Sequence, residues 1–354
     1  MKKILITTGG TGGHIIPAEI IEEHLKNIFE IHYSIDLRGL KFITKHKNDV
    51  VILNTPRLNF NLLFPFKILR TILLIIKSVN YLIIKKIDKV ISIGGYMSLP
   101  MIIAAVILKK EIFLFEPNLI LGRGNKFFLN FAKKIFCYSD QLENFPKKHI
   151  HKIEVIYPLV FKKFYEIKKN DQTNKKFCFL ISGGSQGAKI FNSEIKEVMK
   201  NLSKKYSIKV IHQTNENNIN DLTNYYKSNN IEHEIFSFDK NFMNLINKSD
   251  FCITRAGATS LAEISIMNKP FLAIPLPSAQ DDHQTKNAKY YQKLGCCWIV
   301  DQKNFNREKL FNILLNIINN EEDFMKKKSN LKKLNFQNSW NDVNHKLKEI
   351  INEN

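Results

Sequence analysis

The chain has 354 residues, of which 44% are hydrophobic, and a formal net charge of +20. This length suits two domains of ordinary size, each able to bury its own core. The five cysteines form no C-x-x-C pair, which excludes a zinc site and a disulfide framework and favours reduced core residues in a cytoplasmic protein. The charge favours nucleic acid, anionic lipid or phosphorylated ligands as partners, although abundant Lys, Asn and Ile also indicate AT-rich coding.

Apolar runs alternate with helical patterns through the N-terminal half, which predicts a parallel sheet with right-handed crossovers. Strands are expected at Lys3–Thr7, Ile31–Ser34, Val50–Leu53, Val90–Ile93, Ile112–Phe115, Lys134–Cys137 and Lys152–Ile156. Helices fit Pro17–Asn27 and Pro100–Leu108 between them.

A glycine-rich turn, GGTGGH at 9–14, follows the first expected strand and precedes a helix. Such a turn can bind phosphate, because free backbone N–H groups and the helix dipole converge there. It is not the dinucleotide fingerprint, because Ile15 stands where the third glycine would be, and it lacks a Walker lysine. His14 at the helix start is either a neutral base or phosphate ligand, or a capping or packing histidine.

The segment Phe60–Ile87 is the only membrane-like stretch of the sequence. Its longest uncharged apolar run is Thr71–Ile76, far short of the roughly 20 residues that span a bilayer. Apolar side chains mixed with lysine and arginine favour a helix lying at an anionic membrane surface; the alternative is a buried crossover helix. No nucleic-acid-binding module is recognisable, so no nucleic acid partner is expected.

Another glycine loop, GGYMSLP at 94–100, follows the strand Val90–Ile93 and should share a sheet edge with the first turn. Tyr96 and Ser98 could bind a polar ligand there. An ordinary strand–helix turn explains the loop equally well.

The polar segment Phe161–Lys176 indicates an interdomain linker, after which the pattern restarts. Strands are expected from Phe177 and at Lys209–His212, Glu234–Phe236, Phe251–Thr254, Phe271–Pro275 and Cys297–Val300. Helices fit Ala188–Leu202, Phe242–Asn247, Thr259–Met267, Asp282–Leu294 and Trp340–Ile351. A second glycine turn, GGSQG at 183–187, has the same strand–turn–helix setting as the first.

Two further loops of the C-terminal half carry polar side chains. In TRAGATSLAE at 254–263, Thr259 or Ser260 could cap a helix and Glu263 could accept both ribose hydroxyls; the alternative is a capping-box glutamate. His283, Gln284 and Asn287 share a face near a helix start and could bind sugar hydroxyls. The alternative there is a solvated helix start.

Five motifs in this order resemble those of the MurG family of GT-B glycosyltransferases. They are GGTGGH at 9–14, GGYMSLP at 94–100, GGSQGA at 183–188, TRAGATSLAE at 254–263 and DHQTKNA at 282–288. The resemblance covers nearly the whole chain and implies an α/β chain with the GT-B fold, in which the parallel sheets of two Rossmann-like domains face a central cleft. It implies an acceptor- and membrane-binding domain over 1–157, with a C-terminal helix over 338–354 packed back on it, and a donor-binding domain over 158–337.

The resemblance also implies the reaction. It is an inverting transfer of N-acetylglucosamine from UDP-N-acetylglucosamine (UDP-GlcNAc) to the 4-hydroxyl of undecaprenyl-diphospho-N-acetylmuramoyl-pentapeptide (lipid I), giving a β1→4 product (lipid II) for peptidoglycan. No cofactor or metal is implied, and no D-x-D pair is placed to hold one. The enzyme would act peripherally at the cytoplasmic face of the bacterial inner membrane, against its anionic surface through Phe60–Ile87.

His14 is the implied catalytic base. The donor set implied by motif match is Thr11, Gly12, Gly13, Asn118, Ser185, Gln186, Phe238, Ala258, Thr259, Glu263, His283 and Gln284. The implied acceptor set is Gly12, Gly13, His14, Tyr96 and Ser98. Within the donor set, Ser185 and Gln186 would contact the diphosphate, Glu263 the ribose and Phe238 the uracil.

The sequence departs from the family at two places. Phe115 and Pro117 replace the usual His and Gln of a His-Glu-Gln-Asn motif that ends here at Asn118. Val160 stands where the family has an arginine, and Lys162 or Arg255 could substitute for it.

Two other functions stay open. Another UDP-sugar enzyme of this fold, such as a lipid glycosyltransferase or a UDP-GlcNAc epimerase, would keep the donor site and change the acceptor half. A non-catalytic membrane- or nucleic-acid-binding protein would rest on the charge alone.

Overall fold

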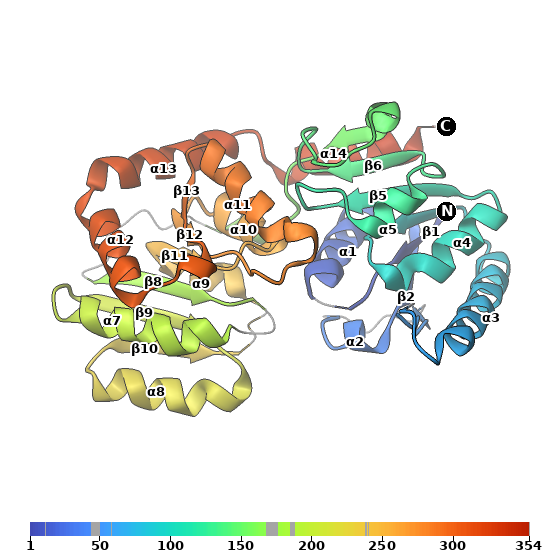
Figure 1. The fold of residues 1–354 in the computed structure, drawn as a ribbon. Helices are drawn as coiled ribbons and strands as arrows, with labels where there is room; N and C mark the ends of the chain where they lie inside the picture. Colours follow the sequence, from blue (N-terminus) through green and yellow to red (C-terminus); the bar gives the residue numbers. More distant parts are fainter. Residues whose placement is uncertain are drawn as a thin grey trace. The chain divides into compact units, whose positions relative to one another are not determined.

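The computed structural model describes residues 1–10, 12–43, 50–57, 59–167, 176–184, 188–237, 239 and 241–353. The chain divides into two compact units, each with its own sheet and core (Figure 1). Unit 1 comprises Met1–Lys162 and Ser339–Asn354, and unit 2 comprises Lys163–Asn338.

Unit 1 is built on a parallel seven-stranded sheet in the order β3-β2-β1-β4-β5-β6-β7. Its strands are β1 (Lys3–Thr7), β2 (Glu30–Ile35), β3 (Val50–Ile52), β4 (Lys89–Ser92), β5 (Glu111–Glu116), β6 (Lys134–Cys137) and β7 (Ile153–Val155). Its helices are α1 (Gly12–Leu25), α2 (Leu37–Leu40), α3 (Phe64–Ile84), α4 (Leu99–Ile107), α5 (Arg123–Phe128) and α14 (Trp340–Asn352). The predicted βα alternation and all seven predicted strands are confirmed.

One hydrophobic cluster of unit 1 joins the sheet to α1 and to the C-terminal helix α14. Val343, Leu347, Ile350 and Ile351 of α14 are buried in it beside side chains of α1. The Trp340 ring stacks on His24 with centroids 3.6 Å apart and an interplanar angle of 15°. The last helix therefore belongs to the same core as the first one.

Burial of His24 makes unit 1 sensitive to acid. The side chain is 2% exposed, and burial lowers its pKa from 6.5 to about 4. A depressed folded-state pKa costs nothing above pH 6.5 but favours the unfolded, protonated state as the pH falls toward 4. We expect this histidine alone to remove about 2–3 kcal/mol of stability by pH 4.5. Denaturant unfolding at pH 7.5 and 4.5 measures this effect. Between these pH values, His24→Phe should lose less free energy of unfolding than wild type does.

The matched control for this change is His345→Gln, because His345 lies on α14 with its side chain 81% exposed. This control should lose stability on acidification as wild type does. Equal acid losses in wild type and His24→Phe would contradict the expected role of His24.

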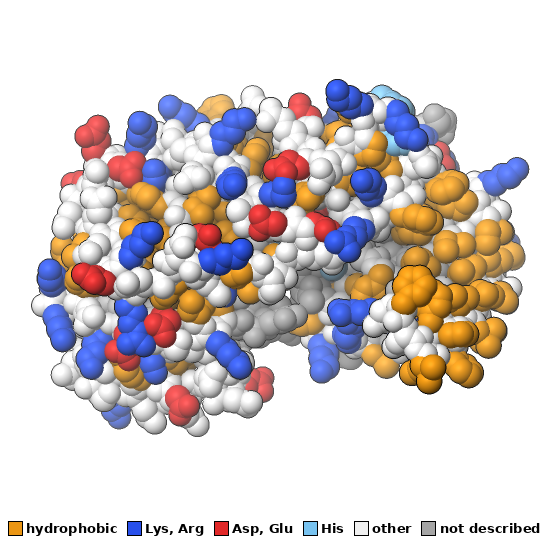
Figure 2. Space-filling model, viewed as in Figure 1, with side chains coloured by type: hydrophobic (Ala, Val, Ile, Leu, Met, Phe, Trp, Pro, Cys, Tyr) orange, Lys and Arg blue, Asp and Glu red, His pale blue; other side chains and the backbone are white. Residues whose placement is uncertain are grey.

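Helix α3 has its polar and apolar sides the opposite way round from an ordinary surface helix, with small polar residues buried and large apolar residues exposed. Its buried residues are Thr71, Ser78 and Leu82, and both hydroxyls donate to carbonyls four residues earlier in the helix. Its large apolar side chains instead face outward, namely Phe66, Ile68, Leu69, Ile72, Leu73, Ile76, Ile83 and Ile84. Hydrophobic side chains crowd the surface in Figure 2 where Figure 1 shows α3. The alternative of a buried crossover helix is wrong, since most large apolar side chains of α3 are exposed. The helix packs on α4 and the adjoining core through Thr71, Ser78 and Leu82, with Leu74, Val79 and Tyr81 partly buried beside them.

No helix within the described residues has the length and apolarity of a membrane span. The five cysteines are all buried, so the prediction that they are core residues is confirmed.

Unit 2 repeats the plan with a parallel six-stranded sheet in the order β10-β9-β8-β11-β12-β13. Its strands are β8 (Phe177–Ser182), β9 (Ile208–Gln213), β10 (Glu232–Phe236), β11 (Phe251–Thr254), β12 (Phe271–Ala273) and β13 (Cys297–Ile299). Its helices are α6 (Lys162–Tyr165), α7 (Lys196–Ser203), α8 (Ile219–Ser228), α9 (Phe242–Lys248), α10 (Ala258–Ile266), α11 (His283–Lys293), α12 (Arg307–Asn319) and α13 (Glu321–Leu334).

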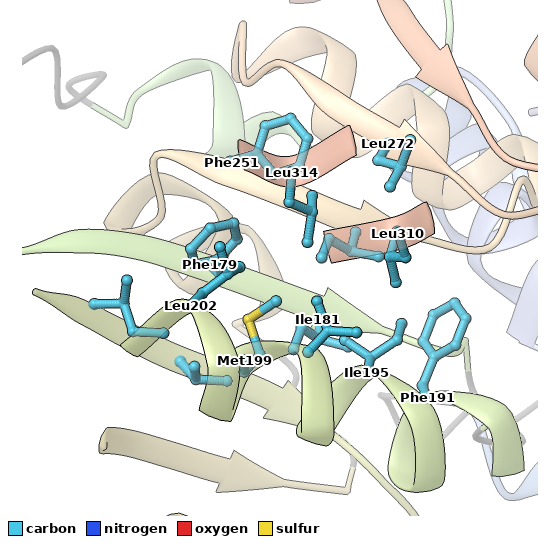
Figure 3. Packing of buried hydrophobic residues seen from close by; sticks show 14 of the residues in the cluster. Phe179, Ile181, Phe191, Ile195, Met199, Leu202, Phe251, Leu272, Leu310 and Leu314 are labelled. Atoms are coloured by element: carbon cyan, nitrogen blue, oxygen red, sulfur yellow. The ribbon is translucent and has the colours of Figure 1, made fainter. Parts of the chain in front are cut away.

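The core of unit 2 lies between its sheet and helices α7 and α12. Phe179, Phe251, Met199, Leu310 and Leu314 interdigitate there (Figure 3). The predicted helix Ala188–Leu202 forms as one continuous helical run, which contains a π-helical turn over Phe191–Ile195 directly before α7. The predicted linker Phe161–Lys176 contains α6, and its residues 168–175 lie outside the described part of the chain.

Candidate active site

The strand order of unit 1 reverses between β1 and β4, which pair in parallel from Ile4 to Thr7. Open parallel sheets bind ligands at such a reversal, beyond the carboxyl ends of the strands. The glycine turn after β1 and the loop Gly94–Pro100 after β4 both lie at this point. The prediction that the two loops share one sheet edge is therefore confirmed.

The first glycine turn is held by an aspartate that the sequence did not single out. Gly10 has φ +86°, a backbone conformation that strains any residue with a side chain, and a Cβ there would also displace the Met97 methyl group, 2.8 Å away. Its N–H donates to Asp36 Oδ1 at 2.7 Å, and Asp36 is 3% exposed. This amide is therefore committed to the fold and not to a ligand. Thr11 lies outside the described residues.

Gly12, Gly13 and His14 form the first turn of α1, five residues earlier than the predicted helix start. His14 is partly exposed, and its Nδ1 lies 3.2 Å from the Ile93 carbonyl oxygen. Since a carbonyl can only accept, Nδ1 carries the hydrogen, and Nε2 of the neutral ring carries the lone pair. This tautomer is the one that a general base requires on the Nε2 side.

Tyr96 and Ser98, which follow β4, differ in access. Tyr96 is partly exposed, whereas Ser98 is fully buried. The Ser98 hydroxyl lies 3.1 Å from the Gly94 carbonyl oxygen and 3.3 Å from that of Thr7, as a donor. A ligand does not reach this hydroxyl in the structure, and Ser98 ties the loop to β1.

Asn118 is organised by a buried glutamate at the end of β5. Glu116 Oε1 accepts from the Asn118 side chain at 2.9 Å, and Oε2 accepts from the Gly122 N–H at 2.8 Å and from Asn125 Nδ2 at 3.0 Å. Burial raises the pKa of Glu116. Motif matching singled out Asn118 but not Glu116, which holds it. The sequence signal for Glu116 was a charged residue at the end of the apolar strand FLFE.

Both family departures lie in the core of unit 1. Phe115 is fully buried and packs edge-to-face on Tyr138. Val160 is 1% exposed and directly follows Leu159, a buried member of the cluster that contains α1 and α14. The position of the family arginine is therefore a packing position in this chain.

Unit 2 also has a strand-order reversal, between β8 and β11. The second glycine turn follows β8, and Gly184 has φ +79° with open space where a Cβ would be. Ser185 and Gln186 of this turn lie outside the described residues, as does Phe238.

Glu263 is a buried carboxyl on α10, the helix that follows β11. It is 9% exposed, and burial raises its pKa to about 8. The helix is capped by Gly257 without a side-chain bond, and it begins at Ala258. The expected cap by Thr259 or Ser260 and the capping-box alternative for Glu263 are therefore wrong. Ala258 and Thr259 lie partly exposed at the start of α10.

Gln284 and Asn287 connect α11 to the loop after β11. Gln284 Oε1 accepts from the backbone N–H of Ala256 at 3.2 Å and of Leu276 at 2.9 Å, and Asn287 Nδ2 donates to the Ala256 carbonyl at 3.1 Å. His283 instead donates through Nδ1 to the Gln280 carbonyl at 2.8 Å. Gln284 and His283 are partly exposed, while Asn287 is buried and acts in the fold.

Arg255 is a buried cation at the same sheet edge. It is 7% exposed, its Nη1 donates to the Ile274 and Pro275 carbonyls, and its guanidinium lies 4.8 Å from the Phe191 ring centroid. Burial lowers its pKa to about 10. No carboxylate among the described residues pairs with it. The backbone N–H of Arg255 donates to the carbonyl of Ser182, the residue before the second glycine turn.

Two parallel-sheet units with glycine turns at their strand-order reversals define a GT-B fold. A crystal structure titled as MurG of Acinetobacter baumannii matches with a TM-score of 0.78 and 23% identity over 100% of both chains. A Neisseria meningitidis UDP-GlcNAc 2-epimerase bound to UDP-GlcNAc matches with a TM-score of 0.66 and 15% identity, over 99% of this chain and 100% of that one. At these identities the two structures show the fold alone.

Sequence similarity identifies the family. The glycosyltransferase family 28 N-terminal domain matches residues 4–137, and the family 28 C-terminal domain matches residues 178–343. A Pelagibacter ubique protein is 46% identical over 354 residues, which are 100% of this chain and 99% of that one. It is named UDP-N-acetylglucosamine--N-acetylmuramyl-(pentapeptide) pyrophosphoryl-undecaprenol N-acetylglucosamine transferase. The chain belongs to glycosyltransferase family 28 and, within it, to the family of these transferases.

Proposed function

We propose that this protein transfers N-acetylglucosamine from UDP-GlcNAc to the 4-hydroxyl of undecaprenyl-diphospho-N-acetylmuramoyl-pentapeptide, for peptidoglycan synthesis. The observation that carries the proposal is the 46% identity, over the full chain, to a relative named for this transfer. The two sites described above supply the groups that the reaction needs.

Unit 2 is the proposed donor domain. Glu263 holds the ribose, because a carboxylate accepts two neighbouring hydroxyls and the described residues offer its carboxyl no hydrogen-bond donor. The N–H groups after β8 and the Arg255 guanidinium face the diphosphate charge in this proposal. The donor set by motif match also includes Ser185, Gln186, Phe238, His283 and Gln284, together with Ala258 and Thr259 on α10. Its remaining members are Thr11, Gly12, Gly13 and Asn118 of unit 1.

Unit 1 is the proposed acceptor domain, with Gly12, Gly13, His14 and Tyr96 at its sheet edge. Ser98 holds the loop that carries Tyr96 in place, through its hydrogen bonds to the carbonyls of Gly94 and Thr7. Asn118 is partly exposed and held by Glu116, which suits a fixed amide for a sugar group.

The chemistry is a single displacement. The acceptor's 4-hydroxyl oxygen bonds to the donor's anomeric carbon as the bond from that carbon to the UDP oxygen breaks. The hydroxyl proton passes to His14 Nε2, and the electron pair leaves with UDP. Attack opposite the leaving group converts an α-linked donor into a β1→4 product. Positive charge and N–H groups at the leaving diphosphate stabilise the transition state.

Acceptor-dependent release of UDP tests the proposal. Purified protein is mixed with UDP-GlcNAc, with and without a short-chain analogue of the lipid acceptor. We expect UDP release only with the acceptor. Release or conversion of UDP-GlcNAc without the acceptor would favour a UDP-GlcNAc epimerase, and binding of anionic polymer without any UDP-sugar affinity would favour a non-catalytic protein.

We further propose that α3 docks unit 1 on an anionic membrane surface, on the cytoplasmic face of the bacterial inner membrane. Phe66 is 70% exposed and Leu69 is 55% exposed, although fully burying either would gain about 1.5–3 kcal/mol. Lys67, Arg70 and Lys77 lie on the same helix and suit anionic headgroups. The inverted packing of α3 supports this docking over packing within the chain.

Removing the apolar face of α3 should release the protein from lipid. We expect the double change Phe66→Gln and Leu69→Gln to weaken partitioning onto phosphatidylglycerol vesicles at least 10-fold in a sedimentation assay. Phe336→Gln is the matched control, because Phe336 is 86% exposed and lies in unit 2. Equal partitioning of all three proteins would contradict the docking of α3.

A further inference from the structure

Two arginines that the proposed acceptor site does not yet use flank Tyr96 at the carboxyl edge of the unit 1 sheet. Arg38 lies in α2, directly after β2, and Arg57 follows β3. The Cζ atom of each guanidinium lies 5.5 Å from the centroid of the Tyr96 ring. Three neighbouring strand ends therefore bring two cations and one aromatic hydroxyl together.

The two arginines differ in their partners. Arg38 donates from Nε to Asp36 Oδ2 at 2.8 Å and from Nη2 to the Tyr96 hydroxyl. Arg57 is exposed, and its recorded contact is the Tyr96 ring, with no carboxylate of the described residues paired to it. Asp36 also accepts from the Gly10 and Gly39 N–H groups, so one carboxylate serves two amides and one guanidinium.

The cluster thus keeps an excess positive charge that the fold does not use. It also lies beside a glycine turn that has lost one anion-binding amide, because the Gly10 N–H is bonded to Asp36. An oxyanion at this edge would need charge from another source. Guanidinium groups bind phosphate and carboxylate oxygens strongly, often through two parallel hydrogen bonds.

We propose that Arg38 and Arg57, whose guanidinium groups both lie against the Tyr96 ring, form a binding site for an oxyanion of the acceptor substrate. The inference rests on the proposed function, since it assigns the ligand from the acceptor of that reaction. Two groups of the acceptor have this chemistry, its diphosphate and the carboxylates of its peptide. Asp36 orients Arg38, and Tyr96 fixes the spacing of the two cations through its ring and hydroxyl.

The test compares Arg57→Gln and Arg38→Gln with wild type in the acceptor-dependent UDP-release assay. We expect each change to raise the KM for the acceptor about 10- to 100-fold, the range of one charge-assisted hydrogen bond. The KM for UDP-GlcNAc and the affinity for UDP should not change. Arg57→Lys should recover part of the loss, and the acceptor KM of Arg57→Gln should depend less on salt than that of wild type.

Lys148→Gln is the control, because Lys148 is an exposed cation of unit 1 outside the cluster, and its kinetics should equal those of wild type. An acceptor with amidated peptide carboxylates identifies the group bound. If Arg57→Gln has no effect with that acceptor, the arginines bind a carboxylate; if the effect persists, they bind the diphosphate. Both results support the site.

Unchanged acceptor KM values in both arginine variants, with an active wild-type enzyme, would overturn the inference and leave the proposed function intact. A fall in UDP affinity equal to the change in acceptor KM would also overturn it, since that pattern indicates a general loss of fold. A wild-type protein that neither turns over nor binds the acceptor analogue in calorimetry would overturn the proposed function itself.

Discussion

Replacing His14 by glutamine is expected to lower kcat of the transfer reaction about 10²- to 10⁴-fold, the usual contribution of a general base. Glutamine can still donate to the Ile93 carbonyl that now receives Nδ1–H, so the start of α1 should keep its geometry. The variant lacks the Nε2 lone pair that takes the proton of the acceptor hydroxyl in the proposed mechanism. The measurement is kcat from acceptor-dependent UDP release at saturating substrates.

The pH profile separates a base from a binding group. The wild-type rate should fall on acidification as the imidazole takes up a proton, and the residual rate of His14→Gln should not show this limb. His151→Gln, at an exposed histidine of unit 1, should behave as wild type. A variant that keeps the acidic limb, or that changes only the acceptor KM, would show that His14 is a phosphate ligand and not the base.

The second large effect is expected at Glu263, where one substitution should change stability and donor affinity in opposite directions. Its pKa of about 8 in the folded protein lies above the ordinary value of 4.5. A raised carboxyl pKa gives a contribution that is present below pH 4.5 and lost as the pH rises to 8. Glutamine has no such loss, so ligand-free Glu263→Gln should be about 3 kcal/mol more stable than wild type at pH 7.

The same change should weaken UDP binding about 10- to 100-fold at pH 8 and above, where the wild-type carboxylate is charged. Wild-type affinity should fall as the pH drops below 8, because the proposed contact with both ribose hydroxyls needs the ionised carboxylate. The affinity of Glu263→Gln should stay flat over this range. Calorimetry with UDP and denaturant unfolding, with Glu308→Gln as the exposed control in unit 2, measure both effects. A variant that is less stable and binds UDP as wild type does would contradict the proposed role.

Much of the scaffold could be predicted because parallel strands buried on both faces are continuous apolar runs. The strands Lys3–Thr7, Lys134–Cys137 and Phe251–Thr254 have the predicted bounds. Helix ends were harder. Pro17 indicated a helix start, whereas α1 begins at Gly12 and Pro17 lies inside it, in the second turn.

The orientation of α3 could not be predicted because its large apolar residues lie on the exposed side, whereas periodicity assigns such residues to the buried face. The packing partner decides the buried face instead. That partner is α4 with the adjoining core, which α3 meets with Thr71, Ser78 and Leu82. In the same way, the S-x-x-E spacing of Ser260 and Glu263 fits a capping box, but the helix begins at Ala258, which places Ser260 inside it.

Site residues supplied by neighbouring strands were the hardest to predict. His14 and Glu263 lie within their motifs, so local pattern and resemblance found them. Glu116 was missed although it acts locally, on Asn118 two residues later. Asp36 follows β2 but acts on the glycine turn after β1, and only the sheet order brings it there. Sequence spacing carries no signal for such contacts.

The most direct test of the central claim is the structure of the product. UDP-GlcNAc labelled with ¹³C at the anomeric carbon is incubated with the protein and a short-chain lipid acceptor, and the lipid product is examined by mass spectrometry and NMR. The account predicts one added N-acetylhexosamine, with the labelled carbon in a β linkage to oxygen 4 of the muramoyl sugar. Label in an α linkage, at another oxygen, or only in an altered nucleotide sugar with no lipid product would contradict it.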